Sequence, residues 1–291
     1  MTQGSLGFHC HRLEHIEEGI LKNDLNRGEF YNFPPEEIPA LKLELASKEL
    51  ARSVHAPLIR PEWYPNPPTL SFLCDVDKDN RNLTLRMINE SIAQAEDIGA
   101  EYLVVHFPSP STDASGESRE KLLSIAWRSC DQLAELSVKR GMPIHIEGLG
   151  DSPFLDLEFL GKALSEYPLR YCFDTGHMHL ASQLNNFDLY EFAAGIAPFV
   201  GSIHLWNSRG RDDYLNFRHI PVHPSQDPEE GWADIKRLLK ILKPSCPIIF
   251  ESPPSYPSAL GDFDWRDGIK WVKEILEQGG EDEPEAEADE H

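Results

Sequence analysis

The sequence predicts an α/β protein in which eight parallel strands close into a (β/α)8 barrel. Short runs of β-branched and aromatic residues alternate with longer segments whose apolar residues recur at helical spacing. Eight such strand–helix units fit within about 280 residues, which is typical of a barrel, and alternating units of this kind require a parallel sheet. A doubly wound open sheet is disfavoured because no GxGxxG motif follows the first strand.

The predicted strands are short and mostly apolar. They cover residues 6–10, 29–33, 53–57, 102–107, 143–147, 170–174, 202–206 and 247–251. The clearest amphipathic helices are predicted over 83–98, 122–136, 232–242 and 265–276, and Gly99 and Gly141 stand where glycine commonly ends a helix. The segment 65–82, rich in Pro and Asp, is the longest insertion and is expected to be a lid or substrate loop.

The charge balance limits the partners of the protein. The 291 residues include 27 Lys and Arg against 49 Asp and Glu, a formal charge of −22, with an ordinary globular content of 40% hydrophobic residues. This balance argues against a nucleic-acid coat or a binder of anionic membranes, since both need clustered basic residues. The last eleven residues, 281–291, contain seven acids and no Lys or Arg. We therefore expect one barrel domain over 1–278 and a disordered acidic tail over 279–291, with a partner-binding tail as the alternative.

Cysteine usage and hydropathy suggest the compartment. The five cysteines are scattered, form no CxxC pair, and are odd in number. The first fifteen residues lack the apolar core of a signal peptide, and no stretch approaches the roughly 18 apolar residues of a membrane span. These features predict a reduced, cytoplasmic protein without disulfides. Homo-oligomerisation is left open.

Polar side chains of metal-ligand type stand at the ends of six consecutive predicted strands. They are His55, His106, Glu147, Asp174 followed by His177, His204, and Glu251, with His219 in the loop after the seventh strand. Each alone is compatible with an ordinary hydrogen-bonded residue. Together they converge, because active sites of these barrels gather at the carboxyl ends of the strands. Buried polar groups in such numbers are costly unless paired or metal-bound, and mixed His and carboxylate ligands suit Zn²⁺, Mn²⁺ or Fe²⁺.

Seven motifs occur in order around these residues: H-A-P, H-x-P, I-E-G, D-T-G-H, H-L-x-N, R-H-x-P and E-S-P. Over residues 50–255 this set resembles the xylose isomerase-like TIM-barrel superfamily, which includes sugar isomerases, epimerases and endonucleases of the endonuclease IV type. The resemblance implies a divalent cofactor, one to three ions of Zn, Mn or Co. It assigns a core metal to the set Glu147, Asp174, His204 and Glu251.

The endonuclease branch of the superfamily implies two further metals. One would be held by His55 and His106 with Glu147 bridging, and the other by His177 and His219. The sequence departs from that branch at two positions. Phe217 stands where an Asp would assist His219, and Leu58 stands near His55 where an aromatic residue helps to open DNA. Both departures weaken the case for nucleic acid as a substrate.

Two reaction classes remain in competition. The favoured one is isomerisation or epimerisation of a sugar or sugar phosphate, with Glu147 and Glu251 as the acid–base pair, His177 on a substrate hydroxyl, and Arg209, Arg211 or Arg218 on a phosphate or carboxylate. The alternative is zinc-dependent phosphoester hydrolysis, favoured by the full set of histidines. A non-catalytic sugar- or metal-binding barrel, or lyase or decarboxylase chemistry, is less favoured. Among the other histidines, His9 is expected to be structural and His145 to be buried and hydrogen-bonded.

Overall fold

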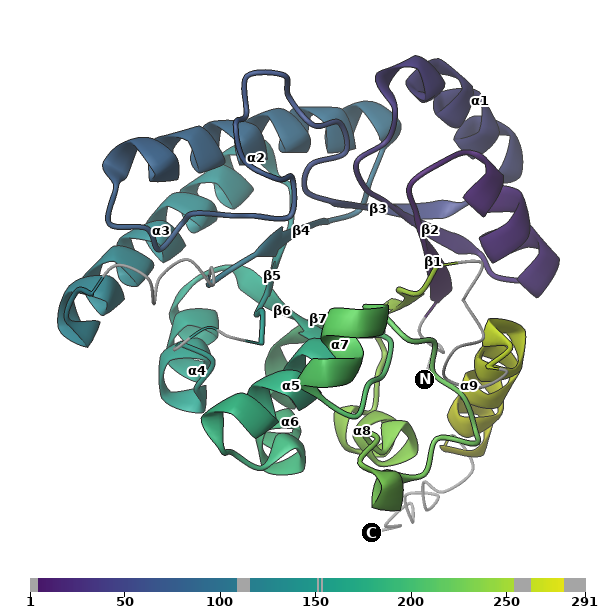
Figure 1. The fold of residues 1–291 in the computed structure, drawn as a ribbon. Coiled ribbons are helices and arrows are strands. Elements are labelled where there is room, and N and C mark those ends of the chain that lie inside the picture. Colours follow the sequence, from purple (N-terminus) through teal and green to yellow (C-terminus); the bar gives the residue numbers. More distant parts are fainter. Residues whose placement is uncertain (1–4, 109–115, 151, 153, 254–262, 280–291) are drawn as a thin grey trace, which may run out of the picture.

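The computed structural model describes residues 5–108, 116–150, 152, 154–253 and 263–279, and these form a closed barrel of eight parallel strands (Figure 1). Each strand pairs with its neighbours in chain order, and the last pairs with the first. The predicted barrel is therefore confirmed. The strands are β1 (Leu6–Cys10), β2 (Arg27–Phe30), β3 (Ala51–His55), β4 (Leu103–His106), β5 (Ile144–Glu147), β6 (Leu169–Asp174), β7 (Val200–Leu205) and β8 (Ile248–Phe250).

Helices surround the barrel on the outside (Figure 1). They are α1 (Ile38–Lys48), α2 (Lys78–Ile98), α3 (Arg119–Arg140), α4 (Leu157–Glu166), α5 (Thr175–Asn185), α6 (Leu189–Ile196), α7 (Arg211–Phe217), α8 (Ile235–Leu242) and α9 (Trp265–Gly279). Short helical turns cover Ile16–Ile20, Leu21–Asn23, Pro35–Glu37, Ala197–Phe199 and Pro228–Glu230. None of the helices in the described ranges combines the length and apolar character needed to cross a bilayer. The predicted acidic tail lies outside the described residues, apart from the end of α9.

Helix starts differ from the sequence prediction where an aspartate caps the first turn. The helix expected from residue 232 begins instead as α8, because the Asp234 carboxylate accepts a hydrogen bond from the backbone N–H of Arg237. α2 begins five residues earlier than expected, because Asp77 caps it in the same way. The end of the 65–82 insertion is therefore helical rather than loop.

The strands separate an apolar core, which lies between the barrel and the helices, from a polar interior inside the barrel. Outward-facing residues such as Phe8, Ile146 and Phe173 belong to the large apolar core that the helices cover. The inside of the barrel is instead largely polar and hydrogen-bonded. Ser53 donates to Glu29 at 2.9 Å, and the His145 ring lies 2.9 Å from the Ser202 hydroxyl oxygen, so His145 is buried and bonded as expected. This polar layer lies beneath the strand ends.

Two helical glycines, one tightly packed and one with open space around it, provide a matched test of helix packing. A Cβ at Gly268 in α9 would lie 1.9 Å from the Val222 carbonyl oxygen, whereas a Cβ at Gly161 in α4 would meet nothing within 4 Å. We expect Gly161→Ala to raise the free energy of unfolding by about 0.5–1 kcal/mol through helix propensity. Gly268→Ala should lower it by about 1–3 kcal/mol through overpacking. Urea unfolding of both variants checks this, and shifts in the same direction would contradict it.

Candidate metal centre

The barrel brings four of the predicted ligands into one buried group. Glu147, Asp174, His204 and Glu251 each offer a ligand atom, and these atoms all lie within 4.8 Å of one another. Each residue is at most 8% exposed. The group forms because β5, β6, β7 and the residue after β8 bring these side chains to the carboxyl end of the barrel. In the strand register His106 is opposite Glu147 and Asp174 is opposite His204.

The geometry of this group is that of an open coordination site. His204 Nδ1 lies 3.1 Å from Glu251 Oε2, 3.6 Å from Glu147 Oε2 and 3.9 Å from Asp174 Oδ2. Within the described part of the chain, His204 Nδ1 and Glu251 Oε2 are buried and have no hydrogen-bond partner of good geometry. Buried polar atoms rarely stay unsatisfied. Three carboxylate groups around one imidazole nitrogen match the ligands of Zn²⁺ or Mn²⁺.

The electrostatics of the group indicate a missing positive charge. Burial, followed by the charge of Glu147, raises the pKa of Asp174 to about 7. Burial also acts to raise the pKa of Glu147, but the charge of His204 and the hydrogen bond from His55 outweigh it and hold that pKa well below its usual range. One imidazole is thus shared by more acidic groups than it can neutralise. A divalent cation would offset the excess negative charge of the three carboxylates. The residues therefore suit a metal site.

Asp174 is held rigidly by two hydrogen bonds. Its Oδ1 accepts from the backbone N–H of His177 at 2.6 Å and so caps α5, and its Oδ2 accepts from the Trp206 indole N–H at 2.7 Å. A carboxylate oxygen has two lone pairs, so both oxygens keep acceptor capacity for a ligand. The motif D-T-G-H therefore ends a strand, begins a helix and orients an acid at the same time.

Glu29 is a site residue that sequence reasoning missed. It is fully buried on β2, with Oε1 2.8 Å from His204 Nε2 and Oε2 bonded to Ser53. Among the described residues neither of these two facing atoms makes a hydrogen bond of good geometry, so Glu29 acts on the ring through its charge and leaves Nδ1 facing the other three acids. Its signal in the sequence was an acid at the start of the predicted strand 29–33, which lies within the observed β2. Candidate metal ligands were predicted only at the carboxyl ends of strands, and Glu29 lies before the end of its strand.

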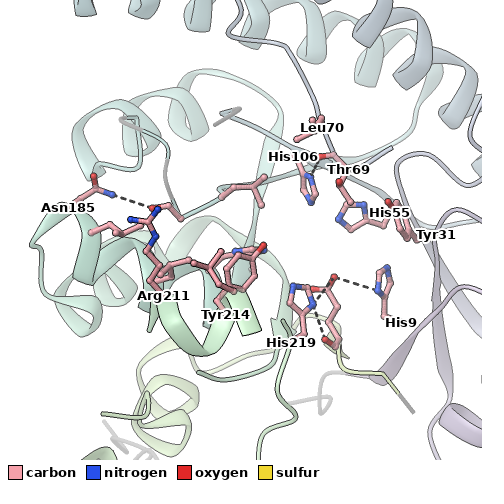
Figure 2. A pocket seen from close by; sticks show the side chains of 17 residues that line it. His9, Tyr31, His55, Thr69, Leu70, His106, Asn185, Arg211, Tyr214 and His219 are labelled. Atoms are coloured by element: carbon pink, nitrogen blue, oxygen red, sulfur yellow. Dashed lines mark hydrogen bonds and ion pairs between the residues drawn. The ribbon is translucent and has the colours of Figure 1, made fainter. Parts of the chain in front are cut away.

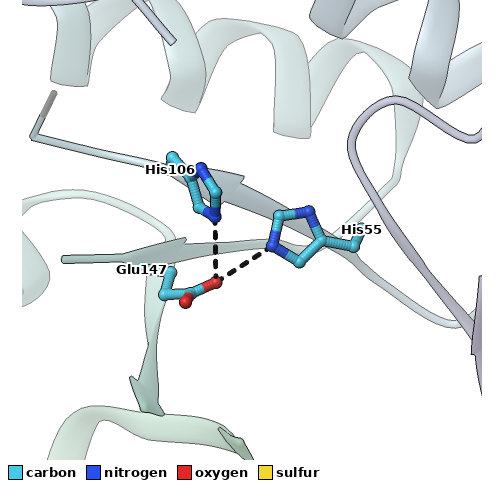
Figure 3. A group of neighbouring side chains, drawn as sticks. All are labelled: His55, His106 and Glu147. Atoms are coloured by element: carbon cyan, nitrogen blue, oxygen red, sulfur yellow. Dashed lines mark hydrogen bonds and ion pairs between the residues drawn. The ribbon is translucent and has the colours of Figure 1, made fainter. Parts of the chain in front are cut away.

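A second group shares Glu147 with the first. His55, His106 and Glu147 offer ligand atoms within 4.8 Å of one another, and both rings face the same carboxylate oxygen (Figure 3). The distances to Glu147 Oε2 are 3.1 Å from His55 Nε2 and 3.6 Å from His106 Nε2. His106 Nδ1 donates to the Thr69 carbonyl at 2.5 Å, which turns Nε2 toward Glu147. Burial lowers the pKa of His106 to about 3, so the ring is neutral and can ligate.

The other two predicted ligands lie nearby without forming a comparable group. His177 and His219 both line the cavity, with ring centroids 5.6 Å apart. His219 stacks on Trp206 at 4.3 Å, and its Nδ1 donates to the Glu251 carbonyl at 3.1 Å. Neither belongs to a group of three or more candidate ligands among the described residues. At the position where a third ligand was sought, Phe217 ends α7.

The three predicted arginines have different surroundings. Arg211 lines the cavity. Arg209 makes a bidentate pair with Asp213, at 2.7 and 3.0 Å, and Arg218 lies over the Tyr214 ring at 5.4 Å. Neither Arg209 nor Arg218 is among the residues that line the cavity.

A cavity of about 540 Å³ opens above the two groups (Figure 2). Its wall includes Glu251, His55, Thr69 from the predicted lid segment, and Tyr31, which sequence reasoning did not select. His9, expected to be structural, also lines the cavity, with Nδ1 3.5 Å from Glu251 Oε1. The volume lies within the range of about 300–1,000 Å³ typical of small-molecule sites.

The carboxylate behind His204 can be tested directly. We expect Glu29→Gln to weaken binding of Mn²⁺ or Zn²⁺ by about 10- to 100-fold, since the amide holds the ring less well and leaves less negative charge beside it. Isothermal titration of the purified protein measures the affinity. Glu101→Gln, which removes a half-exposed carboxylate paired with Arg27 outside the cavity, is the matched control. Equal affinity in Glu29→Gln and wild type would show that Glu29 does not position the ligand.

Comparison with solved structures gives neighbours of the same architecture. A D-tagatose 3-epimerase-like protein is 19% identical with a TM-score of 0.71, covering 95% of this chain and 98% of its own. L-ribulose 3-epimerase is 14% identical with a TM-score of 0.68, covering 96% of both chains. Endonuclease IV from Thermus thermophilus is 18% identical with a TM-score of 0.56, covering 96% of this chain and 100% of its own.

Identities this low establish the fold alone, and no curated protein matches the sequence. The model of one family, described as the xylose isomerase-like TIM barrel, matches residues 13–275. The chain therefore belongs to the xylose isomerase-like TIM-barrel family.

Proposed function

We propose that this protein is a divalent-metal-dependent enzyme that isomerises or epimerises a small sugar or sugar phosphate. The observation that carries the proposal is the buried group of Glu147, Asp174, His204 and Glu251, of which Glu251 lines a cavity of small-molecule size. Two of its acids, Glu147 and Glu251, approach the same imidazole nitrogen from different strands, at 3.6 and 3.1 Å. The epimerases among the structural neighbours are consistent with this choice.

The chain supplies the proton transfers that the reaction needs. One of Glu147 and Glu251 takes a proton from the carbon next to a substrate carbonyl. The other returns a proton to the neighbouring carbon in an isomerisation, or to the opposite face in an epimerisation. A bound divalent ion polarises the carbonyl and offsets the negative charge that develops. His177 and Arg211, which both line the cavity, bind a substrate hydroxyl and a phosphate or carboxylate.

Phosphoester hydrolysis is the second candidate, because one observation favours it. His55, His106 and Glu147 form a second ligand group that a single-metal isomerase does not need. Two neighbouring divalent ions stabilise the charges of a phosphoryl displacement. A small phosphoester fits the cavity better than DNA. The formal charge is −22, and Leu58, where the endonuclease branch opens DNA with an aromatic ring, is 1% exposed and packed in the core.

Metal content separates these candidates. The isomerase proposal predicts one tightly held ion per chain at Glu147, Asp174, His204 and Glu251, and a weaker second site at most. His106→Gln should then leave the content, measured by plasma mass spectrometry after dialysis, near one ion. Two tightly held Zn²⁺ per chain, reduced to one by His106→Gln and accompanied by phosphodiesterase activity, would instead support the hydrolase.

Activity tests the acid–base pair. We expect the Mn²⁺- or Co²⁺-loaded protein, incubated with a panel of ketoses and ketose phosphates in D₂O, to introduce deuterium next to the carbonyl of its substrate. Glu251→Gln should lower that exchange by at least about 10²-fold, because the proton carrier is lost. Its circular dichroism should match wild type, and Glu101→Gln should retain full exchange. Unchanged exchange in Glu251→Gln would refute the assignment of this acid.

A further inference from the structure

The cavity has two walls of different chemistry. One carries the rings of His9, Tyr31, His55 and His106 from the first four strands and the residues that follow them. The other is built largely from α5 and α7. Figure 2 shows Arg211 and Tyr214 projecting from this second wall, across the cavity from the rings. The polar wall adjoins the metal ligands, since His9 lies 3.5 Å from Glu251 and His55 lies 3.1 Å from Glu147.

The second wall carries apolar side chains that are partly open to solvent. Of the five leucines that line the cavity, Leu180, Leu184 and Leu215 belong to α5 and α7 and Leu149 follows β5, whereas Leu70 lies beside His106 (Figure 2). Leu184 on α5 is 44% exposed and Leu215 on α7 is 54% exposed. The other large hydrophobic residues exposed to this degree in the described ranges are Leu43, Val138 and Leu157, and none of these lines the cavity. Exposed apolar side chains at the mouth of a cavity mark a place where a ligand is bound.

We propose that this wall is an apolar subsite for a hydrophobic substituent on the substrate. The inference rests on the proposed function for the polar end of the ligand, and it narrows the substrate class to sugar derivatives that carry an alkyl or aryl group. Two observations support it. The leucines share one continuous cavity of about 540 Å³ with Glu251 and His219, so one ligand can reach both. Transfer of an alkyl or aryl group onto them removes apolar surface from water on both partners.

Arg211 adds a charge to this wall. It begins α7 and, unlike Arg209 and Arg218, lines the cavity; its side chain is exposed, and among the described residues it forms no ion pair of the kind that joins Arg209 to Asp213. Its three methylene groups extend the apolar surface while its guanidinium remains in water. An amphiphile with aromatic rings and an anionic group therefore matches the subsite.

The first test uses 1-anilinonaphthalene-8-sulfonate, which has aromatic rings and an anionic group. Its binding is measured by fluorescence and does not depend on catalysis. We expect the full-length protein to bind one molecule per chain with enhanced fluorescence. The double variant Leu184→Ser/Leu215→Ser should weaken binding by at least about tenfold, since two leucine contacts are lost. Leu43→Ser/Val138→Ser removes the same kind of exposed apolar surface away from the cavity and should bind as wild type. Equal binding in all three proteins would overturn the proposal.

The second test links the subsite to the substrate class. n-Hexyl β-D-glucopyranoside should displace the probe at a concentration at least about tenfold lower than methyl β-D-glucopyranoside does. Equal displacement by both glycosides, or by neither, would overturn the proposal. So would sedimentation showing that wild type is an oligomer and Leu184→Ser/Leu215→Ser a monomer, because the leucines would then be a subunit contact. Deuterium exchange that fails while both binding tests succeed would reject the proposed reaction and keep the subsite.

Discussion

Three carboxylates share one buried imidazole, and this crowding of negative charge governs the arrangement of the site. Glu147, Asp174 and Glu251 all lie within 4 Å of His204 Nδ1. Glu29 approaches the same ring from below. Charges of one sign this close together inside a protein are costly unless surrounding groups fix them and a cation or a bound proton offsets them. The barrel supplies fixed neighbours through hydrogen bonds from Ser53, Trp206 and the first turn of α5.

Glu147 connects this cluster with the second one, and that position explains why the choice of reaction depends on metal number. Its Oε2 faces His204 on one side and His55 and His106 on the other. With one ion in the four-residue group, His55 and His106 would remain without a metal beside the cavity. With a second ion held by His55 and His106, Glu147 would belong to both ligand groups. Metal occupancy would therefore separate the two proposed reactions.

The fold and the positions of the candidate ligands at the strand ends could be predicted from sequence because both follow from local rules. Strand periodicity fixes which residues face inward, and parallel closure puts the last of them at one mouth. Glu29 and Tyr31 were not predicted as site residues, because their place in the site depends on residues distant in the sequence. Glu29 matters through His204, 175 positions away by number. Arg209 could not be separated from Arg211 for a similar reason, since its pairing with Asp213 depends on the path of the chain into α7.

Asp174 ties the chemistry of the barrel to the placement of a helix. The same carboxylate faces His204 and caps α5, the helix that carries His177 and Leu184 into the cavity wall. Replacing this acid removes a candidate ligand and, at a cost of about 1 kcal/mol, a helix cap as well. A variant at this position therefore disturbs the candidate metal ligands and, through α5, the cavity wall at His177 and Leu184. A substitution of Leu184 on α5 changes the cavity wall alone, whereas a substitution of Asp174 also removes the cap that begins the helix.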